Sequence, residues 1–425
     1  MLDRPSDTAA TDAWLQVANG LVGFDGIVLA VSGGPDSLAM LVGLIALRNQ
    51  SVPLPQIVAV TIDHGLRAEG AAEASHVADI CADLGVAHQT IALDGKPAGN
   101  VQGWARQLRY DALAKVAHSQ FSGRSFAMLT AHTADDQAET VLMRAARGAG
   151  SEGLAGIRAE TKISDCRVLR PFLGWPKERL YQVLLHTPFS PVHDPTNEDA
   201  SYTRVRYRKW LANAPMPDSA RTLAEGMVET AAIAQMENEA LNSYADQAFD
   251  KLDGAKHGYL SGQLALAELP LAVQARLLRR TLLHVARHPD ARAKLDMGRM
   301  VALAKRIERE DKGSTAFAGA RIEWSVASDI VSLFVYAEAG RTGFSAIDVM
   351  PGDCGLWDGR FSIANRSSEQ LRVQGWTSKF ATSRDLGLPK RVLSTLPVVL
   401  DTKGRVLGGP GWHSEAADIA LLCRL

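Results

Sequence analysis

Six residues near the start of the chain have the types and order of a phosphate-binding loop. They are Ser32, Gly33, Gly34, Pro35, Asp36 and Ser37. An apolar run at residues 27–31 precedes them and another follows at residues 38–47, which predicts a strand, a tight turn and a buried helix. Glycines let the backbone approach a bulky anion, and the N–H groups of the loop and the helix start then bind phosphate. The alternative is an ordinary glycine-rich turn, which a bare Gly-Gly would favour.

A second cluster of reactive side chains contains His132, Asp135, Asp136 and Glu139. Residues three and four apart are neighbours on a helix, so the three carboxylates would crowd one end of it. Acidic residues near a helix start are favoured by the helix dipole, and a purely structural cap is therefore an alternative. Beside a phosphate loop, carboxylates can also hold Mg²⁺, for which Asp36 and Asp135 are the candidates, or bind and deprotonate an amine nucleophile.

A possible phosphate clamp lies upstream, where Arg106 precedes Tyr110 by one helical turn. An arginine in this position can hold a phosphate through two parallel hydrogen bonds, whereas the alternative is a surface ion pair. We expect Arg106 to act at the phosphate site.

The elements that must position these residues alternate between strand and helix. Predicted strands cover residues 27–31, 57–62, 89–93 and 126–130, and predicted helices cover residues 71–84, 102–117 and 133–148. Repeated units of this length predict an α/β fold with a doubly wound parallel sheet, whose ligands bind beyond the carboxyl ends of the strands. Ser32, Asp63, His64 and His132 each follow one of these strands, so the sequence places its reactive residues at one sheet edge.

The second half of the chain lacks the alternation of strands and helices seen in the first half. A helical pattern covers residues 220–309, and short apolar strands with turn signals begin near residue 319. We expect a catalytic domain at residues 1–215, a helical domain at 216–338 and a small β-rich (α+β) domain at 339–425.

Composition is typical of a soluble cytoplasmic enzyme. The 425 residues are too many for one core, the hydrophobic fraction of 46% can fill several, and the net charge of −1 makes any basic surface local. No apolar signal or membrane span is found. The cysteines are far apart and form no Cys-x-x-Cys pair: Cys81, Cys166, Cys354 and Cys423.

The loop differs from the nucleoside-triphosphatase P-loop, because the Lys-Ser/Thr pair that ends that motif is absent. Its Ser-Gly-Gly-x-Asp-Ser pattern resembles the PP-loop of the ATP pyrophosphatase superfamily, whose members adenylylate a substrate and release pyrophosphate. This resemblance implies the adenine nucleotide α-hydrolase-like version of the doubly wound fold.

Across nearly the whole chain, the ordered motifs resemble the tRNA(Ile)-lysidine synthetase family. The matching segments are residues 32–37, 63–67, 105–110, 131–140, 147–157, 169–173, 194–199, 385–389 and 396–400. One position departs, because the family often has Arg-Asn where this chain has Arg204 and Val205. The role of that basic segment is therefore open.

The resemblance implies a reaction. ATP activates C2 of the wobble cytidine in an isoleucine tRNA with a CAU anticodon, and the side-chain amine of free L-lysine attacks, giving lysidine, AMP and pyrophosphate. In these roles residues 32–37, with Asp63 and His64, bind the nucleotide, and Asp36 contacts Mg²⁺. Asp136 or Glu139 binds the ammonium and accepts its proton.

Charge that develops on the α-phosphate or the leaving AMP needs a partner, for which His132 or Arg106 is suited. Two segments are candidates for tRNA contact: residues 204–209 and the stretch with Arg276, Arg279, Arg280, Arg287 and Lys294. Phosphate contact and a solvated helix face are both open for the second stretch. Trp357, Trp376 and Trp412 can stack on bases, although core packing is the favoured role for most of them.

Two other functions remain open. A tRNA thiolation enzyme of the PP-loop class would call for paired or catalytic cysteines, which the scattered cysteines do not favour. A non-catalytic nucleotide- or tRNA-binding module would not need the carboxylates at residues 135, 136 and 139. The sequence leaves the oligomeric state open, with a homodimer as one option, and no membrane partner is expected.

Overall fold

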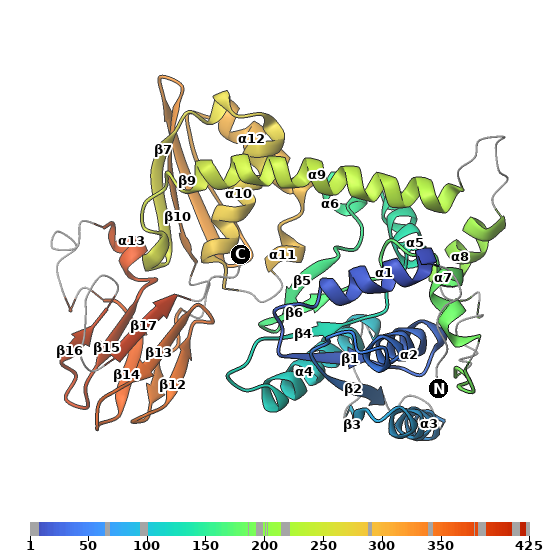
Figure 1. Cartoon of the computed structure of the whole chain (residues 1–425). Helices are drawn as coiled ribbons and strands as arrows, with labels where there is room; N and C mark the ends of the chain where they lie inside the picture. Colours follow the sequence, from blue (N-terminus) through green and yellow to red (C-terminus); the bar gives the residue numbers. More distant parts are fainter. Residues whose placement is uncertain are drawn as a thin grey trace. The chain divides into compact units, whose positions relative to one another are not determined.

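The computed structural model describes residues 8–63, 69–93, 101–185, 187–192, 199, 201, 203–213, 222–287, 291–338, 343–377, 379–380, 388–409 and 417–421. The chain divides into two compact units, Met1–Met236 and Glu237–Leu425, and helix α9 (Leu223–Phe249) runs through the boundary (Figure 1). The three domains expected from the sequence stay a prediction. None of the helices in these ranges is long and apolar enough to span a membrane.

The first unit contains a six-stranded sheet with the order β3-β2-β1-β4-β6-β5 (Figure 1). Its strands are β1 (Gly26–Ala30), β2 (Gln56–Asp63), β3 (Ala87–Ala92), β4 (Phe126–Leu129), β5 (Glu160–Ile163) and β6 (Cys166–Leu169). Neighbouring strands are parallel except for the antiparallel β5–β6 pair. The predicted doubly wound α/β sheet is therefore confirmed, and the edge hairpin β5–β6 is an addition that the sequence patterns did not indicate.

Both faces of this sheet are buried, which explains the continuous apolar runs of its central strands. Ile27 and Leu29 of β1 pack in one core, whereas Val28 packs in the other with Tyr110 and Phe121. The helices of this unit are α1 (Thr8–Asn19), α2 (Pro35–Asn49), α3 (Gly70–Asp83), α4 (Val101–Gln120), α5 (Ala134–Ala145), α6 (Ser151–Leu154), α7 (Lys177–Tyr181), with the 3-10 turn η1 (Gln182–Leu184), and α8 (Thr203–Asn213).

The second unit begins with helices packed on a four-stranded antiparallel sheet of order β7-β10-β9-β8. Its elements are η3 (Ala255–His257), β7 (Tyr259–Leu264), η4 (Leu266–Glu268), α10 (Leu271–Val285), α11 (Ala291–Lys294), α12 (Met297–Arg309), β8 (Lys312–Phe317), β9 (Ala320–Ala327) and β10 (Ile330–Ala337). The helical pattern predicted for residues 220–309 was wrong at β7, where Leu260 and Leu264 are buried against the helices and the strand pairs with distant β10.

The C-terminal part is β-rich, as predicted. One sheet has the order β11-β14-β15-β16 and another β12-β13-β17. Their elements are β11 (Ile347–Val349), β12 (Cys354–Trp357), β13 (Phe361–Asn365), β14 (Leu371–Gly375), α13 (Lys390–Leu393), β15 (Pro397–Leu400), β16 (Val406–Gly408) and β17 (Ala417–Leu421). Trp357 and Trp376 are buried in the core of this part, which confirms packing as their role, and Trp412 lies outside the described residues.

Candidate active site

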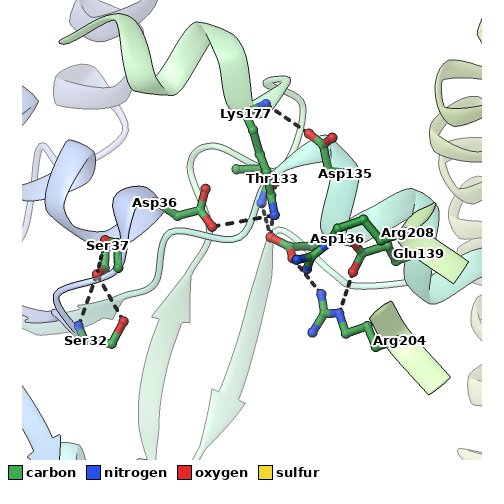
Figure 2. Close-up of polar contacts among 11 residues, drawn as sticks. Ser32, Asp36, Ser37, Thr133, Asp135, Asp136, Glu139, Lys177, Arg204 and Arg208 are labelled. Atoms are coloured by element: carbon green, nitrogen blue, oxygen red, sulfur yellow. Dashed lines mark hydrogen bonds and ion pairs between the residues drawn. The ribbon is translucent and has the colours of Figure 1, made fainter. Parts of the chain in front are cut away.

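The predicted phosphate loop connects β1 to α2 at the carboxyl edge of the parallel sheet. Ser37 Oγ closes it: this atom accepts from Ser32 N at 3.1 Å, lies 3.2 Å from Ser32 Oγ and donates to Gly34 O at 3.0 Å (Figure 2). Gly33 has a φ of +83°, and a Cβ there would lie 2.9 Å from Val192 Cγ2. The loop therefore requires glycine at this position for both its backbone angle and its space.

The other strand ends meet the same edge. Asp63 is the last residue of β2, and His132 follows β4, which neighbours β1. His64 lies outside the described residues. The sequence prediction that reactive residues collect at the carboxyl ends of the strands is confirmed for Ser32, Asp63 and His132.

Asp136 stabilises the start of α5 and also reaches beyond it. Thr133 N, at the helix N-cap, donates to Asp136 Oδ2 at 2.8 Å. The other oxygen, Asp136 Oδ1, accepts from Arg204 Nη2 of α8 at 2.6 Å. Capping is therefore part of the role of Asp136, and its second oxygen faces a cation from a distant segment.

Glu139 is the buried centre of an ion-pair network. Its side chain is 1% exposed, and its two oxygens accept from Arg204 Nε at 2.5 Å and Arg208 Nε at 2.6 Å (Figure 2). The arginine side chains are 44% and 38% exposed, so they shield the carboxylate while part of each guanidinium stays accessible. The four oxygens of Asp136 and Glu139 thus all accept hydrogen bonds from the chain itself.

Asp36, unlike Asp136 and Glu139, has a carboxylate oxygen that accepts no hydrogen bond. Its Oδ1 is buried without a hydrogen-bond partner, while its Oδ2 lies 3.8 Å from Lys177 Nζ. Burial raises the pKa of the Asp36 carboxyl above its usual range, with Asp136 adding to the rise and Lys177 and Tyr181 opposing it. A buried carboxylate oxygen beside a phosphate loop fits a cation ligand, and Mg²⁺ at phosphates commonly uses one or two carboxylates.

The surroundings of Asp136 lower the pKa of its carboxyl, in contrast to the raised pKa of Asp36. Burial raises the pKa of this carboxyl, but Lys177, Arg204, the Thr133 N–H and His132 together hold the pKa below its usual range. Asp136 is therefore ionised at neutral pH and can bind an ammonium group.

A cationic cluster surrounds His132. Thr130 Oγ1 lies 2.8 Å from His132 Nδ1, and burial with the nearby Arg170, Arg106 and Arg109 lowers the pKa of His132 to about 3, against the opposite pull of Asp136. The imidazole is thus neutral at physiological pH. A neutral imidazole among guanidinium groups can donate to a phosphate oxygen without carrying a charge of its own.

The arginines of this cluster share one tyrosine. Arg106 and Arg109 lie over the Tyr110 ring with centroid distances of 5.2 Å and 5.5 Å, and Arg170 Nη2 is 3.5 Å from the Tyr110 hydroxyl. Burial raises the pKa of Tyr110, but Arg106, Arg170 and Arg109 together lower it below its usual range. The predicted position of Arg106 one turn before Tyr110 is thus part of a positively charged region that suits an anion.

Comparison with known proteins identifies the family of this chain. Residues 8–214 match the model of the PP-loop domain family. A tRNA(Ile)-lysidine synthase of Novosphingobium aromaticivorans is 40% identical over 273 residues, which cover 62% of this chain and 78% of that protein. One of Rhodopseudomonas palustris is 38% identical over 310 residues, which cover 72% of this chain and 87% of that protein. This chain belongs to the tRNA(Ile)-lysidine synthase family.

Membership of the family confirms the resemblance and the PP-loop fold predicted from the sequence. The structure brings Asp36, Asp135, Asp136 and Glu139 together around Lys177, Arg204 and Arg208 (Figure 2). Among the residues that the structure describes, no group of three or more His, Cys, Asp or Glu side chains is placed to hold a metal ion.

Sequence reasoning assigned no role to Lys177 or Arg170, and it placed Arg204 and Arg208 together in a segment for tRNA contact. The structure instead pairs Arg204 with the carboxylates of α5. One signal was available: Arg204 and Arg208 are four apart, and Asp136 and Glu139 are three apart, so each pair lies on one helix face. Nothing in the spacing indicated that these two faces meet.

For the basic stretch at residues 276–294, phosphate contact and a solvated helix face were both open, and the structure describes the contacts of three of its arginines. Arg276 is 6% exposed and donates to Asn238 Oδ1 of α9, Arg280 pairs with Asp246, and Arg287 pairs with Asp358. Phosphate contact is wrong for the buried Arg276, because its guanidinium is enclosed between helices. The described partners of Arg276 and Arg280 on α10, and of Arg287 just after it, all lie in the second unit.

Proposed function

We propose that this chain attaches free L-lysine to C2 of the wobble cytidine in an isoleucine tRNA with a CAU anticodon. ATP supplies the driving force and leaves as AMP and pyrophosphate. One observation carries the proposal. The PP-loop lies at the carboxyl edge of the sheet together with the acidic pair, Asp136 and Glu139, which forms ion pairs with Arg204. The relatives' name states the same product.

ATP activation is the role of the loop. Residues 32–37 and Asp63 would bind the nucleotide, and the cytidine C2 oxygen would attack its α-phosphate. Asp36 and Asp135 would hold Mg²⁺, which neutralises phosphate charge when bound; the partnerless Asp36 Oδ1 fits that ligand. Adenylylation turns a poor leaving oxygen into a good one.

His132 and Arg106 would act on the phosphoryl group that is transferred. His132 would donate from a neutral imidazole and Arg106 from its guanidinium group, to the oxygens where negative charge develops. AMP, the leaving group of the second step, carries the same phosphate, so one pair of donors serves both steps.

Lysine binding is the role of the acidic pair and its arginines. Lysine is a zwitterion with a second ammonium, so its site needs both signs of charge. Asp136 is the better ammonium ligand, because its side chain is 12% exposed whereas that of Glu139 is 1% exposed and both Glu139 oxygens hold arginines. Asp136 would then accept the proton as the C–N bond forms, Arg204 would bind the lysine carboxylate, and Glu139 would position the two arginines.

The thiolation alternative is not favoured by the cysteines. Cys81 and Cys166 are buried, and burial raises the pKa of Cys81 to about 11, far from that of a thiolate nucleophile. Recognition of the tRNA by residues 216–338 and 339–425 remains part of the proposal, and the enclosed Arg276 does not contribute to it.

The test is transfer of labelled lysine to RNA. We expect the protein, with ATP, to label an isoleucine tRNA transcript with a CAU anticodon, and to leave a transcript with uridine in place of the wobble cytidine unlabelled. The methionine tRNA with the same anticodon is the second control. If the protein transfers sulfur from a labelled sulfur donor to tRNA but transfers no lysine, the proposal is replaced by thiolation. If it binds ATP without any transfer, the proposal is replaced by a non-catalytic binding module.

A further inference from the structure

A lysine from a distant element reaches the phosphate loop, which lacks the lysine that ends a nucleoside-triphosphatase P-loop. Lys177, the first residue of α7, places its Nζ 3.8 Å from Asp36 Oδ2 (Figure 2). Its side chain is only 15% exposed. We propose that Lys177 contacts the β- and γ-phosphates of ATP and stabilises pyrophosphate as it leaves. This inference rests on the proposed function.

The backbone of Lys177 is fixed to the helix that carries the acidic pair. Lys177 N donates to Asp135 Oδ2 at 2.9 Å, and Ala134 N donates to Trp175 O at 2.9 Å. These two hydrogen bonds join the chain before α7 to the first turn of α5. Asp135 is thereby a positioning residue for Lys177, and the ammonium is directed toward the loop rather than into solvent.

The charge balance around the loop calls for such a cation. Lys177 opposes the effect of burial on the pKa of both Asp36 and Asp136, which places its ammonium in the field of the two carboxylates. A triphosphate would bring several further negative charges to the same region, and fixed cations in a poorly hydrated site stabilise them more strongly than water-exposed ones. Lysine is suited to this task as a compact charge with rotatable donors.

A second role is available for a lysine at this place, and it predicts the opposite effect. The Lys177 ammonium lies near Asp136, where the ammonium of the substrate lysine would bind, so it could act as an internal competitor. Removal of a phosphate ligand weakens the binding of pyrophosphate, whereas removal of a competitor lowers the KM for lysine.

The experiment uses the full-length protein and titration calorimetry with magnesium pyrophosphate and with AMP, so it does not require activity. We expect K177M to weaken pyrophosphate binding about tenfold or more, by loss of a charge-assisted contact, while AMP binding is unchanged. K177R should recover part of the affinity. The matched control is K162M, which removes a 68% exposed lysine of β5 that pairs with Asp165 and should leave both affinities unchanged.

Three results would overturn the assignment: unchanged pyrophosphate binding in a folded K177M, equal weakening of pyrophosphate and AMP, or a lower KM for lysine with intact pyrophosphate binding. If the wild-type protein fails to transfer lysine, the proposed function is refuted, but the difference between K177M and wild type in pyrophosphate binding still decides the role of Lys177. The unfolding midpoint of each variant shows whether it is folded.

Discussion

Two helices, α8 in the first unit and α10 in the second, both carry several arginines, but the burial and the partners of these arginines differ. On α8, Arg204 and Arg208 are partly exposed and pair with carboxylates next to a phosphate loop. On α10, Arg276 is 6% exposed and donates to an asparagine and a backbone carbonyl. We therefore propose that the α8 arginines act in substrate binding, whereas we expect the enclosed Arg276 to act in folding.

The largest effect is expected from substitution of Asp136, one of the two carboxylates that pair with the α8 arginines. Asp136→Asn should lower the rate of lysine transfer by about 10²–10⁴-fold, because the amide can neither bind an ammonium as strongly nor accept its proton. The side-chain carbonyl can still accept from Thr133 N, so the helix start is kept. Single-turnover transfer of labelled lysine measures the rate.

The control for this change is Glu178→Gln, an exposed residue of α7, which should transfer lysine at the wild-type rate. Transfer by Asp136→Asn at a rate close to that of wild type would remove this carboxylate from the mechanism and leave its role as a helix cap.

A smaller effect is expected from the α8 arginine itself. Arg204→Met should raise the KM for lysine about tenfold to a hundredfold, because charge-assisted hydrogen bonds to Asp136 and Glu139 are lost together with the ligand for the lysine carboxylate. Steady-state kinetics at saturating ATP and tRNA provide the measurement. Arg206→Met, which changes an exposed neighbour that donates to Thr203 Oγ1, should keep the wild-type KM. A raised KM in both variants would mean that α8 as a whole was disturbed.

On α10, the expected effect is on stability rather than on chemistry. Arg276→Met should lower the free energy of unfolding by about 1–3 kcal/mol, because Asn238, 2% exposed, loses its charged partner. Urea unfolding measures this, and the KM for lysine should not change. Arg299→Met, which removes an exposed arginine of α12, should cost less than about 0.5 kcal/mol. If Arg276→Met lost tRNA affinity without losing stability, α10 would be assigned to tRNA binding.

The smallest effect concerns pH. His132 has a pKa of about 3 in the folded chain and about 6.5 when unfolded, so between these values the unfolded state binds one more proton. The free energy of unfolding should therefore fall as the pH drops below about 6.5. His132→Asn should have a flatter dependence between pH 6.5 and 5 than wild type, and His76→Asn, an exposed control, should not. Equal slopes for wild type and His132→Asn would show that His132 is charged in the folded state.

The strand edge could be predicted because its signals are local. An apolar run that ends in Ser32, Asp63 or His132 shows both the strand and the residue at its carboxyl end, and parallel connections bring such ends together. The burial of Trp357 and Trp376 followed from the same logic, since aromatic residues fill small cores.

The contacts between distant segments could not be predicted. Lys177 reaches Asp36, and Arg204 reaches Glu139, only because α7 and α8 fold back onto the sheet edge. A charge in the sequence does not show whether its partner is a solvent molecule, a carboxylate or an enclosed asparagine, as α10 demonstrates. Strand β7 was missed for the same reason, because its pairing with β10 is set by tertiary structure rather than by its own short pattern.

The most direct test of the account asks which substrate ATP activates. Isoleucine tRNA is incubated with the protein and ATP labelled at the α-phosphate, first without lysine. We predict that label joins the tRNA, that pyrophosphate is released, and that added lysine then discharges the label as AMP with one lysine bound for each AMP formed. Adenylylation of lysine in the absence of tRNA, or lysine transfer without any labelled tRNA intermediate, would contradict the account.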